Sequence, residues 1–171
     1  RGSGVSNNYI LKGFVESREF AKICSDFGID ANGYVNSGRP LTARRIKAIL
    51  SQLGMAGEKG AQDIIELCVI LLQEHSGVAQ MGMSNLCARL NDSPRTTEQR
   101  ARRAVERGLR HIASLGLEDY NNETFMRYSA RLFPFQEVRN EMLYLQGKGE
   151  QRGKANLKTF LDGLMILAEE E

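Results

Sequence analysis

Residues 96–110 read TTEQRARRAVERGLR, and this stretch decides the fold because its apolar and basic residues separate onto two sides of an α-helix. At about 100° per residue, one side collects small and apolar residues, namely Ala101, Ala104, Val105, Gly108, Leu109 and Ile112. The opposite side collects polar and basic residues, namely Thr96, Gln99, Arg100, Arg103, Arg107 and Arg110. Small residues allow a partner helix to approach closely, so we expect the first side to lie in a helical core.

The arginine-rich side indicates contact with a polyanion. Ordinary exposed helices mix Lys with Glu in i,i+4 pairs, whereas here Glu98 and Glu106 are displaced from the centre of the arginine side. Residues 89–115 carry seven arginines against three acidic residues, although the net charge of the 171-residue chain is only +2. Such a local basic patch is typical of nucleic-acid binding, since guanidinium groups bind phosphates and the acceptor atoms of guanine.

A helix-turn-helix is predicted at about residues 83–115. Residues 83–90 form a short amphipathic helix, the stretch NDSP at 91–94 breaks it, and the arginine helix follows with Thr96 or Thr97 as its N-cap. In this motif the first helix braces the second, whose N-terminal turns enter the major groove of DNA. The arginine helix is therefore expected to be the recognition helix.

The predicted contacts with double-stranded DNA follow from this placement. Thr96 and Gln99 are expected to read base edges, and Arg100 and Arg103 to read guanine or bind phosphate. The predicted set also contains arginines near or beyond these turns, namely Arg95, Arg102, Arg107 and Arg110, of which the last two are expected on backbone phosphates. Further backbone contacts are predicted for basic residues outside the motif, namely Arg44, Arg45, Lys154 and Lys158.

The rest of the chain predicts an all-α domain of several helices around a central apolar helix at residues 61–74. We expect residues 1–41 to hold an N-terminal helix, at 9–27, and a linker, with 1–4 as an expression scar. The helical domain is expected to span 42–171. Its helices are predicted from an N-cap at Thr42 to Gly54, from a cap at Asn122 through 123–133, at 135–146, and at 157–167. The last helix is expected to close the core, with a dimer seam as the alternative.

Several function classes are excluded by the sequence. The glycine-rich residues 54–60 lack the preceding strand and the Gly-Lys-Ser/Thr ending of a phosphate-binding loop. Cys24, Cys68 and Cys87 are widely spaced and read as buried free thiols, and with two distant histidines they predict no metal site and no cofactor. The sequence contains no recognisable set of catalytic residues, so the chain is not expected to be an enzyme. No stretch is long and apolar enough to span a membrane, and a cytoplasmic location is expected.

Several ordered segments resemble the YcbB-type effector domain of bacterial two-component response regulators, the family that includes regulators of glutamine utilisation. These segments are LGMAGEKG at 53–60, EQRARRAV at 98–105, HIASLGLED at 111–119, NETF at 122–125 and YSARLF at 128–133. The resemblance covers roughly residues 50–168. It implies a DNA-binding output domain that controls transcription, and it is compatible with homodimers on paired sites.

A weaker likeness connects the middle of the chain to the effector domain of the sporulation response regulator. Thr96 and Thr97 followed by Arg100 and Arg103 match its recognition-helix pattern, which implies base or phosphate contact from this region and from Gln99. Neither likeness covers residues 1–49. No doubly wound β/α alternation with an acidic pocket occurs in this chain, so the receiver domain is expected elsewhere in the full-length protein. Two alternatives stay open: an RNA-binding antitermination domain, or a protein-interaction module with a basic face.

Overall fold

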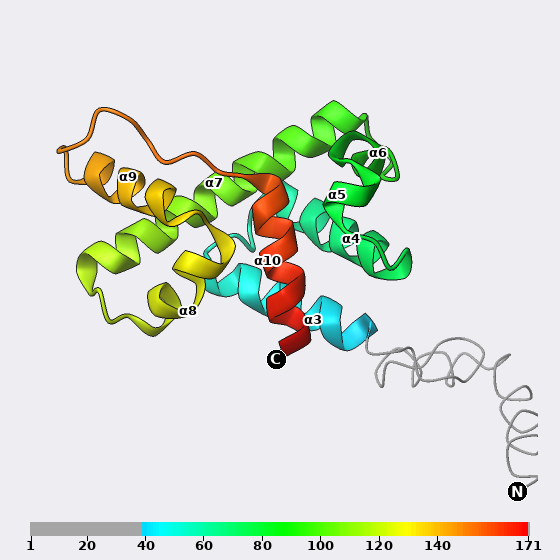
Figure 1. Ribbon diagram of the computed structural model, residues 1–171, viewed down its shortest axis with the longest axis horizontal. Helices are drawn as coiled ribbons and strands as arrows, with labels where there is room; N and C mark the ends of the chain where they lie inside the picture. The colour runs from blue at the N-terminus through cyan, green and yellow to red at the C-terminus, as the bar shows by residue number, and fades with distance from the viewer. Residues whose placement is uncertain (1–38, 171) are drawn as a thin grey trace, which may run out of the picture. The chain divides into compact units, whose positions relative to one another are not determined.

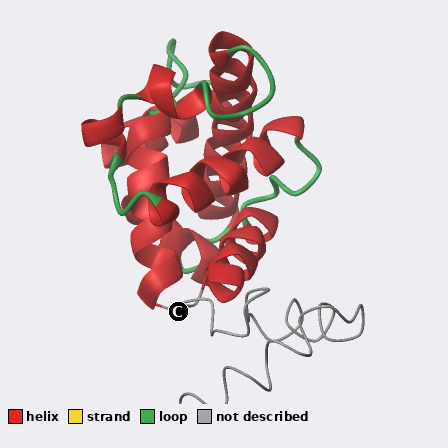
Figure 2. Cartoon of the chain, turned by 90° about the vertical axis from the view of Figure 1, so that its right-hand side faces the viewer, coloured by secondary structure: helices red, strands yellow, loops and turns green. Residues whose placement is uncertain are grey.

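The computed structural model describes residues 39–170, and this part of the chain contains helices and loops without strands (Figures 1 and 2). The helices are α3 (Arg39–Gln52), α4 (Lys59–Gln73), α5 (Val78–Met81), α6 (Met83–Cys87), α7 (Pro94–Glu118), α8 (Glu123–Leu132), α9 (Phe135–Leu145) and α10 (Leu157–Glu170). The all-α prediction is confirmed. The helix expected at 9–27 and Cys24 lie outside the described residues. The chain divides into units of residues 1–44 and 45–171, and the packing of helices is described within the second unit.

Helix α3 ends as predicted but begins earlier. Gly54 adopts φ 70°, a left-handed conformation that favours glycine, and the N–H of Met55 donates to the carbonyl of Leu50 at 2.9 Å. The predicted N-cap at Thr42 is wrong, because α3 already begins at Arg39. Proline is tolerated in the first turn of a helix, so Pro40 does not delay the start.

Helix α7 begins at Pro94, earlier than the predicted N-cap at Thr96 or Thr97 allows. Its N-cap is Ser93, whose Oγ accepts a hydrogen bond from the N–H of Thr96 at 3.2 Å. Pro94 occupies the first helical position, where its missing N–H costs nothing. The prediction that Thr96 or Thr97 caps this helix is therefore wrong: both residues lie inside its first turn.

The short elements before α7 differ from the prediction in length. The helix expected at 83–90 is α6, which ends at Cys87, and the four-residue helix α5 directly before it was not predicted. The later elements agree more closely. Asn122 caps α8 as predicted, since its Oδ1 accepts from the N–H of Phe125 at 3.1 Å.

The core lies around α7, which runs across the domain and packs against α4, α6, α8, α9 and α10 (Figure 1). The apolar side predicted for α7 is buried along its whole length. Helix α4 is a core helix as predicted, with Ile64, Leu67 and Leu71 fully buried. However, α7 contacts more of the other helices than α4 does.

Helix α10 closes the core, as predicted, and crosses α7 in Figure 1. Its buried residues are Leu157, Phe160, Leu161, Leu164, Leu167 and Ala168. The N–H of Thr159 donates to Oδ1 of Asn156 at 3.0 Å, which satisfies one backbone donor at the start of the helix. Cys68 and Cys87 are buried free thiols, as predicted.

Candidate nucleic-acid interface

Helix α6 packs on α7, and residues 88–93 connect the two. Leu86 and Cys87 are fully buried. The N-cap hydrogen bond from Ser93 and the proline at 94 define where the second helix begins. This succession of a short helix, a turn and a long basic helix is compatible with the predicted helix-turn-helix, which stays a prediction.

The N-terminal half of α7 presents an exposed polar surface. Arg95, Thr96, Gln99 and Arg103 are exposed, whereas Thr97 points inward and is fully buried. The hydroxyl of Thr96 lies 2.7 Å from the hydroxyl of the capping Ser93. Within residues 39–170, Arg95 and Arg103 form no ion pair, so their guanidinium groups are available to an external anion.

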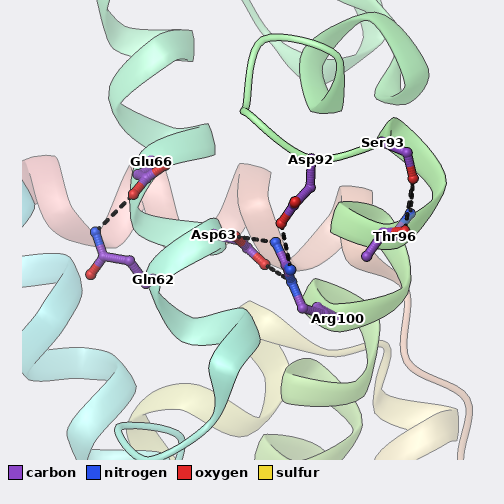
Figure 3. Close-up of polar contacts among 7 residues, drawn as sticks. All are labelled: Gln62, Asp63, Glu66, Asp92, Ser93, Thr96 and Arg100. Carbon is purple, nitrogen blue, oxygen red and sulfur yellow. Dashed lines mark hydrogen bonds and ion pairs between the residues drawn. The ribbon is translucent and has the colours of Figure 1, made fainter.

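Arg100 is placed differently from its neighbours. Its Nε and Nη2 donate to the two carboxylate oxygens of Asp63 in α4, at 2.7 and 3.1 Å. Its Nη1 lies 2.6 Å from a carboxylate oxygen of Asp92, in the connection between α6 and α7 (Figure 3). Hydrogen bonds to Asp63 and then Asp92 raise the pKa of the Arg100 guanidinium above its ordinary value. All three of its nitrogen atoms are therefore engaged within the protein.

The remaining arginines of α7 have weaker partners. Arg102 donates to Glu98 one turn earlier at 2.8 Å, an exposed i,i+4 pair. The ion pairs of Arg107 and Arg110 are longer. Nε of Arg107 lies 3.7 Å from a carboxylate oxygen of Glu58, and Nε of Arg110 lies 3.8 Å from one of Glu141. Exposed pairs contribute little free energy, so phosphates could displace Glu98 from Arg102 and Glu58 from Arg107, whereas Glu141 beside Arg110 is nearly buried.

A basic loop between α9 and α10 lies next to the middle of α7. Its anchor is Glu141, which is 3% exposed and accepts from the N–H of Gly153 at 2.9 Å and from Nη2 of Arg152 at 3.2 Å. The N–H of Lys154 donates to Glu137 at 2.7 Å. An open cavity of about 350 Å³ lies here, with four cationic residues in its wall: Arg102, Arg110, Arg152 and Lys154. The structure thus brings the predicted residue Lys154 together with two arginines of α7.

Arg152 was not in the predicted set, although its position in a glycine-flanked basic loop was a signal. Lys158 lines a smaller cavity, of about 240 Å³, together with Arg102 and Glu98. The guanidinium group of Arg45 is hydrogen-bonded within the protein, since its Nη1 donates to the carbonyl of Ala168, near the end of α10, at 3.1 Å. Arg44 is exposed on α3 and belongs to the unit of residues 1–44, so its contact with DNA stays a prediction.

Other kinds of site are not found in the described residues. Within 39–170, no group of three or more His, Cys, Asp or Glu residues could hold a metal ion. None of the helices described there is long and apolar enough to cross a membrane.

Comparison with known proteins identifies the family. The chain is 30% identical over 142 residues to the transcriptional regulatory protein GlnL of Bacillus subtilis (strain 168), an alignment that covers 71% of this chain. It spans about half the length of that relative, 45%. No solved structure matches the chain significantly. Residues 45–164, which include α7 and the loop that lies beside it, match the YcbB domain family. The chain therefore belongs to the YcbB domain family.

Proposed function

We propose that this chain is a sequence-specific, duplex-DNA-binding output domain of a bacterial two-component response regulator. The observation that carries the proposal is the exposed surface around Arg103, a cation without an ion pair in residues 39–170, with Thr96 and Gln99 on the same side of α7. A relative that matches 71% of the chain is a transcriptional regulatory protein, which supports this role. The proposed role is binding, not catalysis.

In this proposal, base recognition belongs to the first turns of α7. Thr96 and Gln99 have short side chains that hydrogen-bond base edges, and Arg103 has the planar fork that binds guanine O6 and N7. These residues occupy the exposed side of the helix that α6 supports. The N-terminal part of α7 is the part that a helix-turn-helix inserts into the major groove.

Backbone phosphates are assigned to the cations around these turns. They are Arg95, Arg102, Arg107, Arg110, Lys154 and Lys158, to which we add Arg152 because it lines the same cavity as Lys154. Glu141 fixes the backbone of the loop that carries Arg152 and Lys154, so these cations are held beside α7. Phosphate contacts fix the position of a protein on the duplex, whereas base contacts give specificity.

The proposal includes partners that this chain does not contain. The relative is longer than the region matched here, and we place the receiver domain in the corresponding additional part of the full-length protein. We propose binding as a homodimer to two half-sites about 34 Å apart, one helical turn of DNA. Analytical ultracentrifugation of the chain with a two-site duplex tests this, and a complex that never exceeds one chain per duplex would contradict it.

The experiment that tests the proposed function is selection of duplexes from a random library with the 171-residue chain, followed by titration of the enriched duplex. A shuffled duplex and a structured RNA of equal length serve as comparisons. The proposal predicts preferred binding to the enriched duplex and a steep linear fall of log affinity with log salt. Preference for the RNA would support an antitermination role instead. Absence of binding to all three would favour a protein partner for the basic face.

A further inference from the structure

We propose that Arg100 is a positioning residue, which fixes the start of the recognition helix through Asp63 and Asp92 and does not itself contact DNA. This inference rests on the proposed function. It assigns Arg100 a role different from the base or phosphate contact that its place on the helical wheel predicts.

The geometry links three separate segments at one guanidinium group. Asp63 lies in the first half of α4, Asp92 lies in the connection that follows α6, and Arg100 lies in the second turn of α7 (Figure 3). The carboxylate of Asp63 accepts from two nitrogens of Arg100, the bidentate arrangement that fixes the orientation of both side chains. The contact therefore restrains how α7 sits on the core and on the preceding turn.

Among the arginines of α7 that form ion pairs in residues 39–170, Arg100 has the least exposed side chain. The side chain of Asp63 is only 11% exposed, and that of Arg100 is 30% exposed. Within residues 39–170, Asp63 has no partner other than Arg100. If Arg100 turned outward to DNA, a nearly buried carboxylate would lose its only partner, which is strongly unfavourable. The exposed Arg103 pays no such penalty when it binds DNA.

Charge leads to the same assignment. One guanidinium between two carboxylates gives a cluster with a net charge of −1, which repels phosphate. One turn later, Arg103 has no carboxylate partner within the described residues 39–170. The exposed cations of α7 attract DNA, and the Arg100 cluster orients the helix that carries them.

The substitution Asp63→Asn separates the two roles by the sign of its effect. If Arg100 contacts DNA, removing the carboxylate releases the guanidinium and deletes a negative charge, and affinity rises. If Arg100 is a positioning residue, Asp63→Asn loosens the start of α7 and lowers affinity for the enriched duplex, by about tenfold, with little change for the shuffled duplex. The matched control is Glu98→Gln, which also removes the carboxylate partner of an α7 arginine, Arg102, but from an exposed pair.

A double-mutant cycle with Arg100→Met completes the test. We expect Arg100→Met to lower affinity for the enriched duplex about as much as Asp63→Asn does. The double variant should lose no more affinity than the more strongly affected single variant, because both substitutions remove the same contact. The slope of log affinity against log salt should stay that of the wild-type chain, whereas loss of one phosphate contact lowers its magnitude by about 0.9. Thermal unfolding by circular dichroism establishes that each variant is folded at the temperature of the titration.

A milder variant covers the case in which the buried pair is needed for folding. Asp92 is 53% exposed, and Asp92→Asn removes only one carboxylate of the cluster. We expect it to lower the preference for the enriched over the shuffled duplex. A greater preference for the enriched over the shuffled duplex in Asp63→Asn or Asp92→Asn, a reduced salt slope in Arg100→Met, or wild-type preference in all three variants would overturn the inference. If the wild-type chain shows no preferred duplex, the proposed function fails, and the inference about Arg100 fails with it. If the wild-type chain has a preferred duplex but the variants give one of the contrary results above, only the inference about Arg100 fails.

Discussion

Gly60 of α4 lies against the backbone carbonyl of Arg100 in α7, so closely that a Cβ at position 60 would overlap the carbonyl oxygen. The Asp63–Arg100 ion pair lies one turn farther along α4. Two independent contacts, one steric and one ionic, thus fix the same pair of helices at the start of the recognition helix. The absence of a side chain at residue 60 is what permits their close approach.

Gly60→Ala should therefore lower the free energy of unfolding, by about 1–3 kcal/mol, because backbone atoms cannot move aside as a flexible side chain can. Gly57→Ala is the matched control, since an added Cβ there meets no atom within 4 Å in the described part of the chain, its two sequence neighbours aside. It should raise the free energy of unfolding by about 0.4–1 kcal/mol through reduced freedom of the unfolded chain. Urea denaturation measures both. Equal effects of the two substitutions would show that α4 and α7 are not in close contact.

Thr97 carries a buried hydroxyl that has no hydrogen-bond partner among residues 39–170. Thr97→Val replaces this hydroxyl by a methyl group of similar shape, which removes an unsatisfied polar atom. We expect the free energy of unfolding to rise by about 1 kcal/mol, with affinity for DNA unchanged because residue 97 faces the core. Urea denaturation and duplex titration check the two parts. A loss of stability would reveal a partner for the hydroxyl.

Glu141 is expected to hold the loop between α9 and α10. Glu141→Ala leaves the N–H of Gly153 without its acceptor and frees Arg152, so the free energy of unfolding should fall by about 1–3 kcal/mol. Amide exchange of residues 149–155 should accelerate more than that of α7. The control is Glu170→Ala, which removes an exposed pair with Arg131 and should cost less than about 1 kcal/mol. Equal costs would contradict an anchoring role for Glu141.

The two described cysteines should be unreactive in the folded chain. Burial, together with the negative charge of Asp162, raises the pKa of the Cys68 thiol from 9.0 to about 12. Burial, and then the charges of Glu98 and Asp63, raises the pKa of Cys87 to about 11. At about pH 8 both thiols stay protonated, and the thiolate is the nucleophile.

Labelling of a Cys24→Ser variant with a disulfide reagent checks this expectation. Reaction should be slow in buffer and fast in denaturing urea, where the thiols recover their ordinary pKa. The folded state holds the thiol protons up to a higher pH than the unfolded state does. The contribution of the two thiols to the free energy of unfolding is therefore complete below about pH 9 and is lost as pH rises toward the folded pKa values. Labelling at the same rate in both solutions would mean that the two thiols are exposed.

The buried side of α7 could be predicted from the sequence because it depends only on the order of residues along one helix. Ala101, Val105 and Leu109 repeat at helical spacing, and all are buried. The role of Arg100 could not be predicted in this way. It lies on the polar side of its own helix, and the carboxylate that binds it comes from a residue 37 positions earlier.

A signal for this pair was nevertheless present. Asp63 precedes Ile64 and Ile65 in a largely apolar helix, and a charge in such a place is usually paired. The anchoring of the basic loop by Glu141 was harder to see, because it depends on how the chain returns from α9 toward α10. The cap of α7 was misassigned because three hydroxyl residues, Ser93, Thr96 and Thr97, lie close to its start, and Pro94 decides among them.

The account as a whole depends on specific DNA recognition by the start of α7. The most direct measurement compares Arg103→Ala with Arg107→Ala on the enriched and the shuffled duplex. We predict that Arg103→Ala weakens binding to the enriched duplex by about 1–3 kcal/mol and relaxes its base preference, whereas Arg107→Ala weakens both duplexes alike and reduces the salt slope by about 1. Unchanged affinity of Arg103→Ala for both duplexes would contradict the central claim.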